Sequence, residues 1–406
     1  MKELFSLGKL YPCDFLKSGE EPRCEPVELK LMLDDNGTAR LAETAPKEAM
    51  WGEKYWYRSS INATMRRQLK TVVDSILSIY AIHMGSVWLD VAANDGYLLS
   101  CVPAYLKRVG IDPANDSFRL ECERHADYVI QDYFSAEAFK KSKYGNKKVS
   151  VITMISMFYD VPEPDEFLRD VYEILEDDGL VVAQLSYAPL MISGMAWDSI
   201  CHEHKFYYSL FNLKRLFEKN GFRILDCELN NTNAGSFRVY AMKIGGGIAK
   251  FGSQTHRDVC QFRINSILEY EKTLKLDETE TWMKFYENIQ FLKERTVEFI
   301  KRKVAEGKTV MGYGASTKGS TVLQYFGLAN TLITAIADRS SYKHGLRTVG
   351  GNIPIISEEE MRQRNPDFLL ILPFHFLEEF VEREGEYLLQ GGAMIVLCPE
   401  FKIIKK

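Results

Sequence analysis

The sequence predicts an α/β protein with two doubly wound parallel sheets and a small β-rich appendage at the N-terminus. Three observations predict this class. Strand and helix patterns alternate over residues 87–243 and again over residues 309–398, as expected for parallel sheets with crossover helices. A glycine-rich stretch and a long helical pattern rich in Glu and Lys separate the two alternations. At 406 residues, the chain has room for two or three domains of about 100–200 residues each.

The composition is that of a globular protein, with 46% hydrophobic and 26% charged residues. The 51 basic and 56 acidic side chains leave a formal net charge of −5, which argues against a nucleic-acid-binding surface because such a surface needs a basic footprint. Eight cysteines stand singly without a CxxC pair, which favours reduced thiols over a disulfide framework. No apolar run approaches the ~20 residues of a membrane helix, and the start lacks a signal-peptide pattern. We therefore expect a cytoplasmic protein without membrane contact.

The first half of the chain is predicted as an appendage, one helix and a sheet. Short apolar runs broken by prolines fill residues 1–60 and end in the aromatic stretch 51–60, and residues 62–84 show apolar side chains at helical spacing. Strands are expected at 87–92, 108–112, 127–130, 149–156 and 180–186. Helices are expected near 96–102, at 164–176 with residues 177–179 as the stop signal, and at 211–221. A hairpin of two further strands would complete the sheet, at 224–230 and 236–243.

The second half begins with a glycine-rich linker, residues 243–253. An amphipathic stretch from about 257 to 305 predicts helices. The second sheet is expected to contain strands at 309–316, 333–338, 367–373 and 393–398, with helices between them. The predicted domains are the appendage at 1–60, a first α/β unit at 61–245, and a helical connector with a second α/β unit at 246–406.

The loops that follow the strands of the first sheet carry acidic residues. In an open parallel sheet, a ligand lies beyond the carboxyl ends of the strands, at the topological switch point. Asp90 and Asp95, around the first loop, would repel a pyrophosphate and favour a cationic ligand with amine and hydroxyl donors, such as S-adenosylmethionine (SAM). Asp112 suits the ribose hydroxyls, and Asp132 with Phe134 suits the adenine.

The predicted cofactor residues are Asp90, Ala92, Asn94, Asp95, Gly96, Asp112, Asp132, Phe134, Met157 and Gln184. The amide of Gln184 is expected to point out of the strand end. The alternative interpretation is that each aspartate only forms a turn, since Asp favours such positions.

Acid–base side chains gather in residues 202–207. His202 and His204 flank Glu203, and Tyr207 follows closely. An imidazole has an ordinary pKa near ~6.5, which suits a general base at cytoplasmic pH. Histidines two residues apart point to different sides of a helix, so the pattern is not the i, i+4 pair of a zinc protease. A surface loop with incidental histidines is the alternative.

A second glycine-rich loop, residues 310–319, lies between a predicted strand and a predicted helix. With Ser316 and Lys318 at the helix N-terminus, it is a suitable phosphate cradle. Two of its glycines match part of a dinucleotide fingerprint and Asp338 stands one strand later, so the motif also permits NAD(P). A third interpretation is a strand–turn–helix in which the glycines only allow close packing.

A series of short motifs, jointly specific although each is weak alone, resembles one enzyme family. They are, in chain order, ANDG (93–96), SMFYD (156–160), HEH (202–204), GSFRVYA (235–241), GYGASTKGSTVL (312–323), ADRSSYKHG (337–345), IPIIS (353–357) and LPFHF (372–376). The series is similar to that of the SAM-dependent C-methyltransferases of deoxysugar biosynthesis, which make branched 3-C-methyl sugars on a nucleotide carrier. The resemblance covers roughly Phe5 to Ile404. It implies an N-terminal zinc-binding module, a central SAM-binding domain and a C-terminal Rossmann-like domain that helps to hold the nucleotide-sugar.

The resemblance also implies roles for individual residues. A 4-keto sugar has an acidified C–H at C-3, so a base can remove that proton and the enolate carbon can attack the SAM methyl, provided that the two atoms are held ~3–3.5 Å apart. His204 is the first candidate for the base, with Glu203 orienting it and Tyr57 or Tyr207 hydrogen-bonding the enolate oxygen. Substrate contacts are implied for Tyr55, Ser236, Arg238, Ser316, Lys318, Lys343 and His375, with the two lysines facing the diphosphate.

The sequence departs from the family pattern at three places. The two cysteine pairs of the zinc module are absent, and Cys13 and Cys24 alone cannot make a four-ligand site, so we predict no structural zinc. Cys201 stands before HEH where the family often has Tyr. Ala92 replaces the first glycine of the cofactor loop, a small-for-small change that we expect to be tolerated.

The sequence therefore predicts a SAM-dependent C-methyltransferase that acts on a nucleotide-linked 4-keto-deoxysugar. One alternative is an NAD(P)-dependent oxidoreductase that uses the loop at 312–319. The other is a SAM- or nucleotide-sugar-binding protein without catalysis, suggested by Cys201 and the missing zinc ligands. The identity of the nucleotide, the methylated carbon and the oligomeric state are not predicted.

Overall fold

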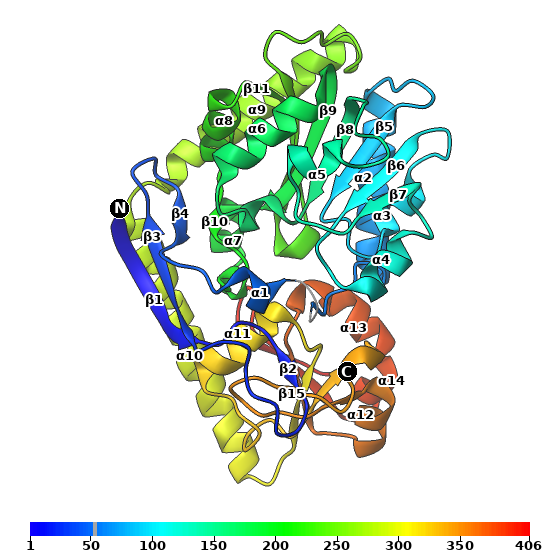
Figure 1. Ribbon diagram of the computed structural model, residues 1–406. Helices are drawn as coiled ribbons and strands as arrows, with labels where there is room; N and C mark the ends of the chain where they lie inside the picture. Colours follow the sequence, from blue (N-terminus) through cyan, green and yellow to red (C-terminus); the bar gives the residue numbers. More distant parts are fainter. Residues whose placement is uncertain (52–54) are drawn as a thin grey trace.

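A computed structural model describes residues 1–51 and 55–406; residues 52–54 of the aromatic stretch lie outside the described residues. Its central region contains a seven-stranded sheet in the order β11-β12-β9-β8-β5-β6-β7 (Figure 1). Five strands run parallel, namely β5 (Val87–Val91), β6 (Lys107–Ile111), β7 (Tyr128–Ile130), β8 (Val149–Ile155) and β9 (Leu175–Ser186). The predicted hairpin is β11 (Phe222–Asn230) and β12 (Ser236–Lys243), and β12 is antiparallel to both of its neighbours. The predicted doubly wound sheet is confirmed.

Both faces of this sheet are buried, which is why its strands are almost continuously apolar. On one face, Leu89 and Val181 pack with Leu168 and Phe217. The opposite face buries Trp88, Val151 and Val182 with residues of α2. The helices of this region are α2 (Ala63–Ile79), α3 (Tyr97–Cys101), α4 (Asp116–Cys122), α5 (Ala136–Lys140), α6 (Pro164–Ile174), α7 (Ala188–Ser193) and α8 (Leu210–Lys219).

One boundary of this sheet was predicted wrongly. The sequence 177–179 was expected to end a helix, but α6 ends at Ile174 and β9 begins at once with Leu175. The ammonium of Lys243 donates to the Leu175 carbonyl (2.9 Å) and to the Asp177 carboxylate (3.2 Å). The acidic stretch is therefore held along the hairpin strand, where the pairing of β8 with β9 shifts register.

The C-terminal region is a second doubly wound sheet, in the order β16-β14-β13-β17-β18-β19. Its strands are β13 (Val310–Tyr313), β14 (Ile336–Asp338), β16 (Ile355–Ser357), β17 (Phe368–Ile371), β18 (Ala393–Val396) and the antiparallel β19 (Lys402–Ile404). The edge strands β16 and β19 were not predicted, since each has only three residues. The helices are α11 (Thr317–Phe326), α12 (Glu358–Arg364), α13 (Leu377–Arg383) and α14 (Gly385–Leu389). The connector forms two helices, α9 (Gln254–Leu274) and α10 (Thr279–Ala305).

The N-terminal strands pair with strands of both α/β regions. An antiparallel sheet contains β1 (Lys2–Leu10), β3 (Val27–Leu33), β4 (Ala39–Leu41) and, from the central region, β10 (Phe206–Tyr207). The short β2 (Phe15–Leu16) pairs with β15 (Arg347–Thr348) of the C-terminal region, and the short helix α1 (Lys47–Met50) follows β4. β1 lies along α10 in Figure 1. The appendage therefore ties the two α/β regions together, and the domain boundaries after residues 60 and 245 stay predictions.

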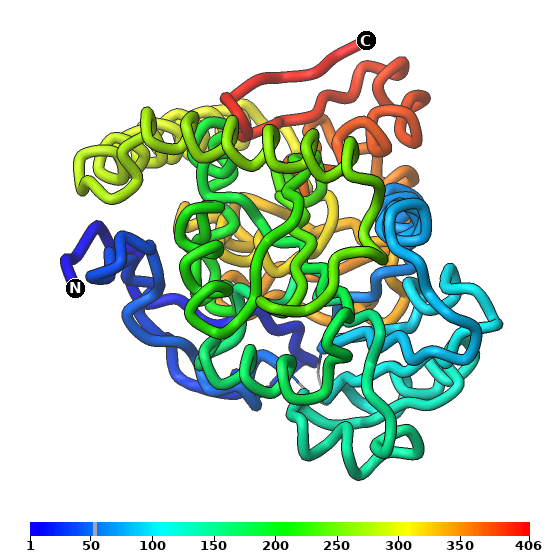
Figure 2. The backbone as a smooth tube through the Cα atoms, turned by 90° about the horizontal axis from the view of Figure 1, so that it is seen from above, coloured from blue at the N-terminus to red at the C-terminus, as the bar shows by residue number. Residues whose placement is uncertain are grey.

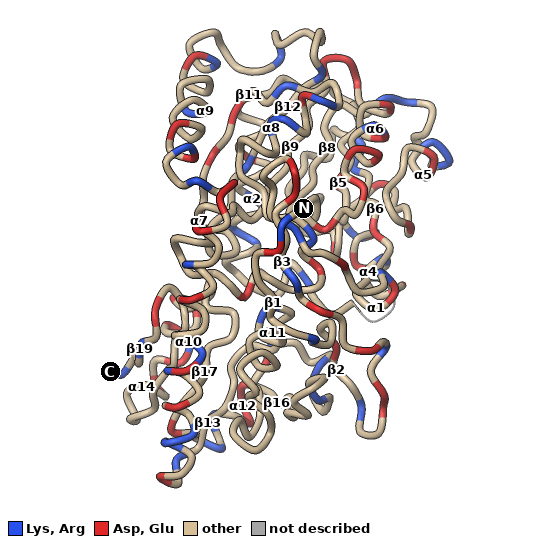
Figure 3. The backbone as a smooth tube through the Cα atoms, turned by 90° about the vertical axis from the view of Figure 1, so that its left-hand side faces the viewer, with Lys and Arg blue, Asp and Glu red and all other residues tan. Residues whose placement is uncertain are grey.

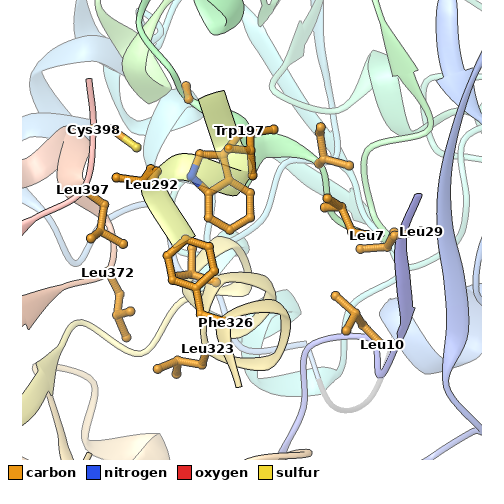
Figure 4. Packing of buried hydrophobic residues seen from close by; sticks show 14 of the residues in the cluster. Leu7, Leu10, Leu29, Trp197, Leu292, Leu323, Phe326, Leu372, Leu397 and Cys398 are labelled. Carbon is orange, nitrogen blue, oxygen red and sulfur yellow. The ribbon is translucent and has the colours of Figure 1, made fainter. Parts of the chain in front are cut away.

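A buried apolar cluster joins all three regions (Figure 4). Trp197 of the central region stacks on Phe326 of α11, with ring centroids 5.0 Å apart and an interplanar angle of 15°. The labelled neighbours come from the N-terminal strands, from α10 and α11, and from the residues that directly follow β17 and β18: Leu7, Leu10, Leu29, Leu292, Leu323, Leu372, Leu397 and Cys398. This packing fixes the position of the C-terminal region against the central one.

The two chain ends are far apart, and charged residues of both signs are mixed over the molecule. The N- and C-termini lie on different sides of the molecule (Figure 2). Basic and acidic residues are interspersed along the chain (Figure 3). Among the described residues, no helix combines the length and apolar character needed to cross a membrane.

We expect Phe326→Ala to lower the free energy of unfolding by about 3–5 kcal/mol, because it leaves a cavity in the cluster that joins the three regions. Phe262→Ala is a matched control, since that ring is 75% exposed and its loss should change stability by no more than about 0.5 kcal/mol. Urea unfolding measures both. Equal unfolding midpoints for the two variants would contradict the role given to the cluster.

Candidate active site

The loop after β5 places acceptor groups at the carboxyl edge of the central sheet. The Asp112 carboxylate accepts hydrogen bonds from the backbone N–H groups of Asn94 and Ala114, both at 2.8 Å. Asp90 is buried and accepts from the hydroxyl of Thr153 (2.6 Å), and burial raises the pKa of its carboxyl to about 7. Two of the four predicted cofactor carboxylates, Asp90 and Asp112, are thus held at one end of adjacent strands.

The other predicted cofactor residues differ in their surroundings. Asp132 is exposed beyond the edge strand β7, and the ring of Phe134 packs 4.8 Å from that of Phe167. Met157 is half-buried beside the short helix η1 (Phe158–Asp160). The predicted orientation of Gln184 is wrong, because its side chain is 1% exposed and its Oε1 accepts from Nε of Arg238 (3.0 Å) within the sheet.

The cofactor loop also holds part of the aromatic N-terminal stretch. The Asn94 side chain accepts from the Ser59 N–H (3.0 Å) and donates to the Tyr57 carbonyl (2.9 Å), while Asp95 accepts from the Ser60 N–H (2.7 Å). Asn94 and Asp95 were predicted to contact the cofactor, yet these contacts bind residues 57–60 to the loop. The stretch that contains Tyr55 and Tyr57 is therefore fixed next to the cofactor side of the sheet.

Backbone conformation at this loop is unusual. Ala92 has φ 58°, Asn94 has φ 53° and Gly96 has φ 78°, all in the left-handed region. An alanine there is disfavoured by about 1–2 kcal/mol relative to ordinary backbone, so the replacement of glycine by Ala92 is sterically accommodated but strained.

A cluster of acidic groups surrounds Glu203. This side chain is 8% exposed, burial raises the pKa of its carboxyl to about 7, and its Oε2 has no hydrogen-bond partner among the described residues. The Cys201 thiol is hydrogen-bonded to Glu203, which opposes that rise. Burial and the nearby Glu203 charge also raise the pKa of Asp160 well above its usual range. Burial raises the pKa values of the neighbouring Tyr55 and Tyr159, so both phenols are protonated at neutral pH.

His204 lies beside this cluster in the neutral state. Its half-buried ring is 4.3 Å from the ring of Tyr159, and its pKa is lowered to about 3 by burial and by the Lys318 charge. The backbone of Ser199 is hydrogen-bonded to the imidazole, so one ring nitrogen is engaged and the other can act as an acceptor.

The other predicted catalytic residues point elsewhere or lie at the margin. His202 is buried, with its Nε2 3.1 Å from the Val27 carbonyl of β3, so it binds the N-terminal sheet and does not face Glu203 or His204. The Tyr207 hydroxyl donates to the Ser199 carbonyl at 3.5 Å. Tyr57 is 37% exposed.

Lys318 brings the C-terminal region into the same site. From the first turn of α11, its ammonium donates to the Ser199 hydroxyl (2.9 Å) and to the Asn233 carbonyl (3.5 Å) of the central region. Burial and the Lys318 charge lower the pKa of His375 to about 3. Asp198 is buried, and burial raises its pKa to about 6 despite the same lysine. Lys318, His375 and His204 are therefore brought together across the two α/β regions.

Several predicted substrate residues have internal partners instead. Arg238 is buried and bonded to Gln184, and the Ser236 hydroxyl donates to the Thr232 carbonyl (2.8 Å). Ser316 caps α11 by accepting from the Gly319 N–H (3.0 Å). Lys343 donates to the Ala315 carbonyl (2.7 Å) and lies 3.4 Å from the Asp338 carboxylate. These contacts leave the substrate roles of the four residues as predictions.

The same contacts bear on the NAD(P) alternative. That alternative needs the Asp338 carboxylate for ribose hydroxyls. The Asp338 Oδ2 accepts from the Ala315 N–H (2.7 Å), its Oδ1 accepts from the Ser340 N–H (2.8 Å), and Lys343 is adjacent. The carboxylate thus stabilises the glycine-rich loop itself.

Sequence reasoning missed four residues of the site: Tyr159, Asp160, Asp198 and Ser199. Tyr159 and Asp160 stand just beyond the carboxyl end of β8, so the rule that located Asp90 could also have found them. No pattern distinguishes Asp198 and Ser199, which are placed by the packing of Trp197.

Only one group of possible metal ligands occurs among the described residues: Asp226, His256 and Cys260. The Asp226 carboxylate already forms an ion pair with Arg263 (3.1 Å). Cys13 and Cys24 are free thiols, and the absence of a structural zinc stays a prediction.

Comparison with known proteins identifies the chemistry. A family model described as a methyltransferase domain matches residues 35–226, and one described as a C-methyltransferase C-terminal domain matches residues 231–399. Over 351 residues the chain is 28% identical to C-methyltransferase NovU of Streptomyces niveus, covering 86% of this chain and 81% of that protein. The chain is a SAM-dependent C-methyltransferase.

Solved methyltransferases resemble part of this methyltransferase. A putative S-adenosylmethionine dependent methyltransferase from Listeria monocytogenes is 11% identical and covers 44% of this chain and 99% of its own, with a TM-score of 0.35. A putative methyltransferase in complex with the Haloferax volcanii Trm112 activator is 12% identical and covers 45% of this chain and 94% of its own, with the same TM-score of 0.35. Likenesses at these TM-scores carry no weight for the assignment.

The residues of this methyltransferase fit the cofactor. SAM offers an ammonium, two ribose hydroxyls and an adenine amine, all of them donors. Asp90, in the last two residues of β5, and Asp112 and Asp132, which follow β6 and β7, are acceptors at the carboxyl ends of three strands. Phe134 follows Asp132 by two residues, and its half-buried ring packs against Phe167.

We expect Gly96→Ala to weaken SAM binding and to destabilise this methyltransferase, because an added Cβ would lie 2.7 Å from Cα of Cys122. Gly85→Ala is the matched control. Gly85 has φ +80°, close to the +78° of Gly96, but no atom lies within 4 Å of its added Cβ. Gly85→Ala should therefore lower the free energy of unfolding only by about 1–2 kcal/mol, which is what a left-handed backbone costs an alanine. Thermal unfolding and calorimetric SAM titration measure both variants. If the two behaved alike, the close approach of α4 to the loop would have no influence on the cofactor site.

Proposed function

We propose that this methyltransferase methylates the carbon next to the ketone of a nucleotide-linked 4-keto-deoxysugar. One observation carries the proposal: the Lys318 ammonium of the C-terminal region donates to Ser199 and lowers the pKa of the His204 imidazole, which follows the buried Glu203 carboxyl in the central region. Methylation of carbon requires a base that removes a proton from carbon and a positive charge near the enolate that forms. The motif resemblance to deoxysugar C-methyltransferases supports the sugar as the substrate class, and the relative, C-methyltransferase NovU, supports transfer of the methyl group to carbon.

Glu203 is the base in this proposal. A general base works best when its pKa is near the operating pH, and the pKa of Glu203 is about 7, whereas that of His204 is about 3. The orphan Oε2 of Glu203 is free to take the C-3 proton. This assignment exchanges the two roles suggested by the sequence, in which His204 is the base and Glu203 its partner.

The remaining groups orient the sugar and stabilise charge. His204, fixed by Ser199 and by the Tyr159 ring, accepts a hydrogen bond from a sugar hydroxyl through its free ring nitrogen. Lys318 stabilises the enolate oxygen electrostatically, which is effective because the ammonium is buried and already positioned. Protonated Tyr55 and Tyr159 are additional donors. SAM, held by Asp90, Asp112 and Asp132, supplies the methyl group when bound.

The direct test is incubation with SAM and a panel of 4-keto-deoxysugars linked to dTDP, GDP or CDP, followed by mass spectrometry. We expect one sugar to gain a single methyl group with release of S-adenosylhomocysteine. His204→Asn should lower turnover by about tenfold, as expected for the loss of one hydrogen bond to the sugar, and leave SAM affinity intact. If SAM binds but no keto sugar gains a methyl group, the substrate class is wrong.

The pH dependence distinguishes the two candidate bases. Glu203 acts as a base only when deprotonated, so kcat/KM should rise about tenfold per pH unit below its pKa of about 7 and level off above it. Glu203→Gln should remove this rising limb and lower kcat by about 10²–10⁴-fold.

His204→Asn serves as the matched control for the pH profile. Burial and the Lys318 charge lower the pKa of His204 to about 3, so the imidazole is neutral from pH 5 to 9. Its replacement should therefore leave the rise of kcat/KM below pH 7 unchanged in the residual activity. If the rise of kcat/KM with pH disappears in His204→Asn and persists in Glu203→Gln, His204 is the base and the assignment to Glu203 is wrong.

A further inference from the structure

A cavity of about 490 Å³ lies between the two α/β regions, next to the stretch that covers the cofactor loop. Its walls come from that stretch, from the end of α4 and from the loop after β14, with Arg58, Ser60, Arg124, His125, Arg339 and Ser340 among them. Its volume is within the roughly 300–1,000 Å³ of small-molecule sites. The residues named in the proposed mechanism lie elsewhere, so this cavity has no assigned role.

The acidic residues in the cavity wall already have partners and cannot neutralise its other arginines. Arg58 is paired with Glu121 (3.0 Å) and lies between the rings of Phe118 and Tyr342, 4.0 and 4.1 Å from their centroids. Asp95 is also engaged, since it accepts from the Ser60 N–H. Both acidic residues of the wall thus have partners.

The other two arginines are available to a ligand. Arg124 is exposed, and within residues 1–51 and 55–406 it forms no ion pair. The Arg339 side chain is 43% exposed, and its guanidinium lies 3.5 Å from the Glu379 carboxylate. The guanidinium of Arg383 lies closer to the same carboxylate, at 3.0 Å, and also neutralises it. Beside them, Ser340 is 5% exposed, and its buried hydroxyl has no hydrogen-bond partner in the described chain. Two guanidinium groups and an orphan hydroxyl are suited to a phosphate.

We propose that this cavity binds the diphosphate of the substrate's nucleotide carrier, an inference that rests on the function proposed above. The alternative position is the loop at the start of α11. There, Lys343 is buried and donates to the Ala315 carbonyl, so it is not available for a new anion without losing this partner. Lys318 is buried next to Ser199, where the proposed function uses its charge for the enolate oxygen and not for the diphosphate.

The cavity is also within reach of the catalytic cluster. Tyr55 senses the charges of Asp160 and Glu203, and Arg58 follows it by three residues. Three residues of extended chain span at most about 10 Å. The stretch that holds Tyr55 next to the catalytic cluster therefore also supplies Arg58 and Ser60 to the cavity wall.

The test is calorimetric titration of the full chain with thymidine, guanosine and cytidine diphosphates, each without SAM. We expect one of them to bind, and Arg124→Ala and Arg339→Ala each to weaken it by about tenfold or more, as for the loss of a charge-assisted hydrogen bond. Arg302→Ala is the control, because Arg302 is 60% exposed on α10 and outside the cavity. SAM affinity should not change in any of the three. In the methylation assay, KM for the sugar should rise more than kcat falls.

Separate outcomes distinguish this proposal from the proposed function. Inorganic pyrophosphate competes with the nucleotide if the diphosphate alone is recognised. Unchanged nucleotide affinity in the Arg124→Ala/Arg339→Ala double variant, or no nucleotide binding by the wild type, overturns the cavity assignment even if keto sugars are methylated. Arginine-dependent nucleotide binding without methylation of any keto sugar supports the cavity and refutes the substrate class.

Discussion

The candidate active site depends on how the turn that carries Glu203 and His204 is held from two sides. On one side, β10 pairs with β4 and His202 faces the Val27 carbonyl, so the N-terminal sheet fixes the turn. On the other side, Lys318 reaches Ser199 from α11. The stacked rings of Trp197 and Phe326 set the distance between these supports. These contacts from both sides hold the polar groups of the two α/β regions next to one another.

The same enclosure produces the electrostatics of the site. Burial raises the pKa values of Asp90, Asp160, Asp198 and Glu203, since removing a carboxylate from water disfavours its charged form. Groups of this kind destabilise the fold above their unfolded pKa, because the folded state must then keep them protonated or bury their charge. Their concentration around a cleft is typical of a functional site, where the strain is retained for chemistry. The left-handed Ala92 in the cofactor loop is a further local strain.

Much of the fold could be predicted from periodicity and turn residues. The parallel strands and the closing hairpin follow from patterns of ten residues or fewer, and the helical connector follows from the amphipathic stretch at about 257–305. The start of β9 could not be predicted, because its acidic stretch resembles a helix stop and only pairing with the Lys243 strand makes it extended. The three-residue edge strands β16 and β19 are too short to show a period. The appendage looked separate because a local pattern does not reveal that β2 and β4 pair with strands hundreds of residues away.

By itself, the sequence determined the two sheets and the order of acidic residues at the carboxyl ends of the first, because the position of a residue after a parallel strand dictates the edge where it lies. It also determined that Glu203 and His204 are neighbours. Only the tertiary structure decided which polar groups remain available. It turned His202 to the N-terminal sheet, buried Arg238 against Gln184 and bonded Lys343 to the Ala315 carbonyl. Within the described part of the chain, it left one carboxylate oxygen of Glu203 and the hydroxyl of Ser340 without a hydrogen-bond partner. The reason is physical: chemical type is local, whereas burial and hydrogen-bond satisfaction are set by contacts between distant segments.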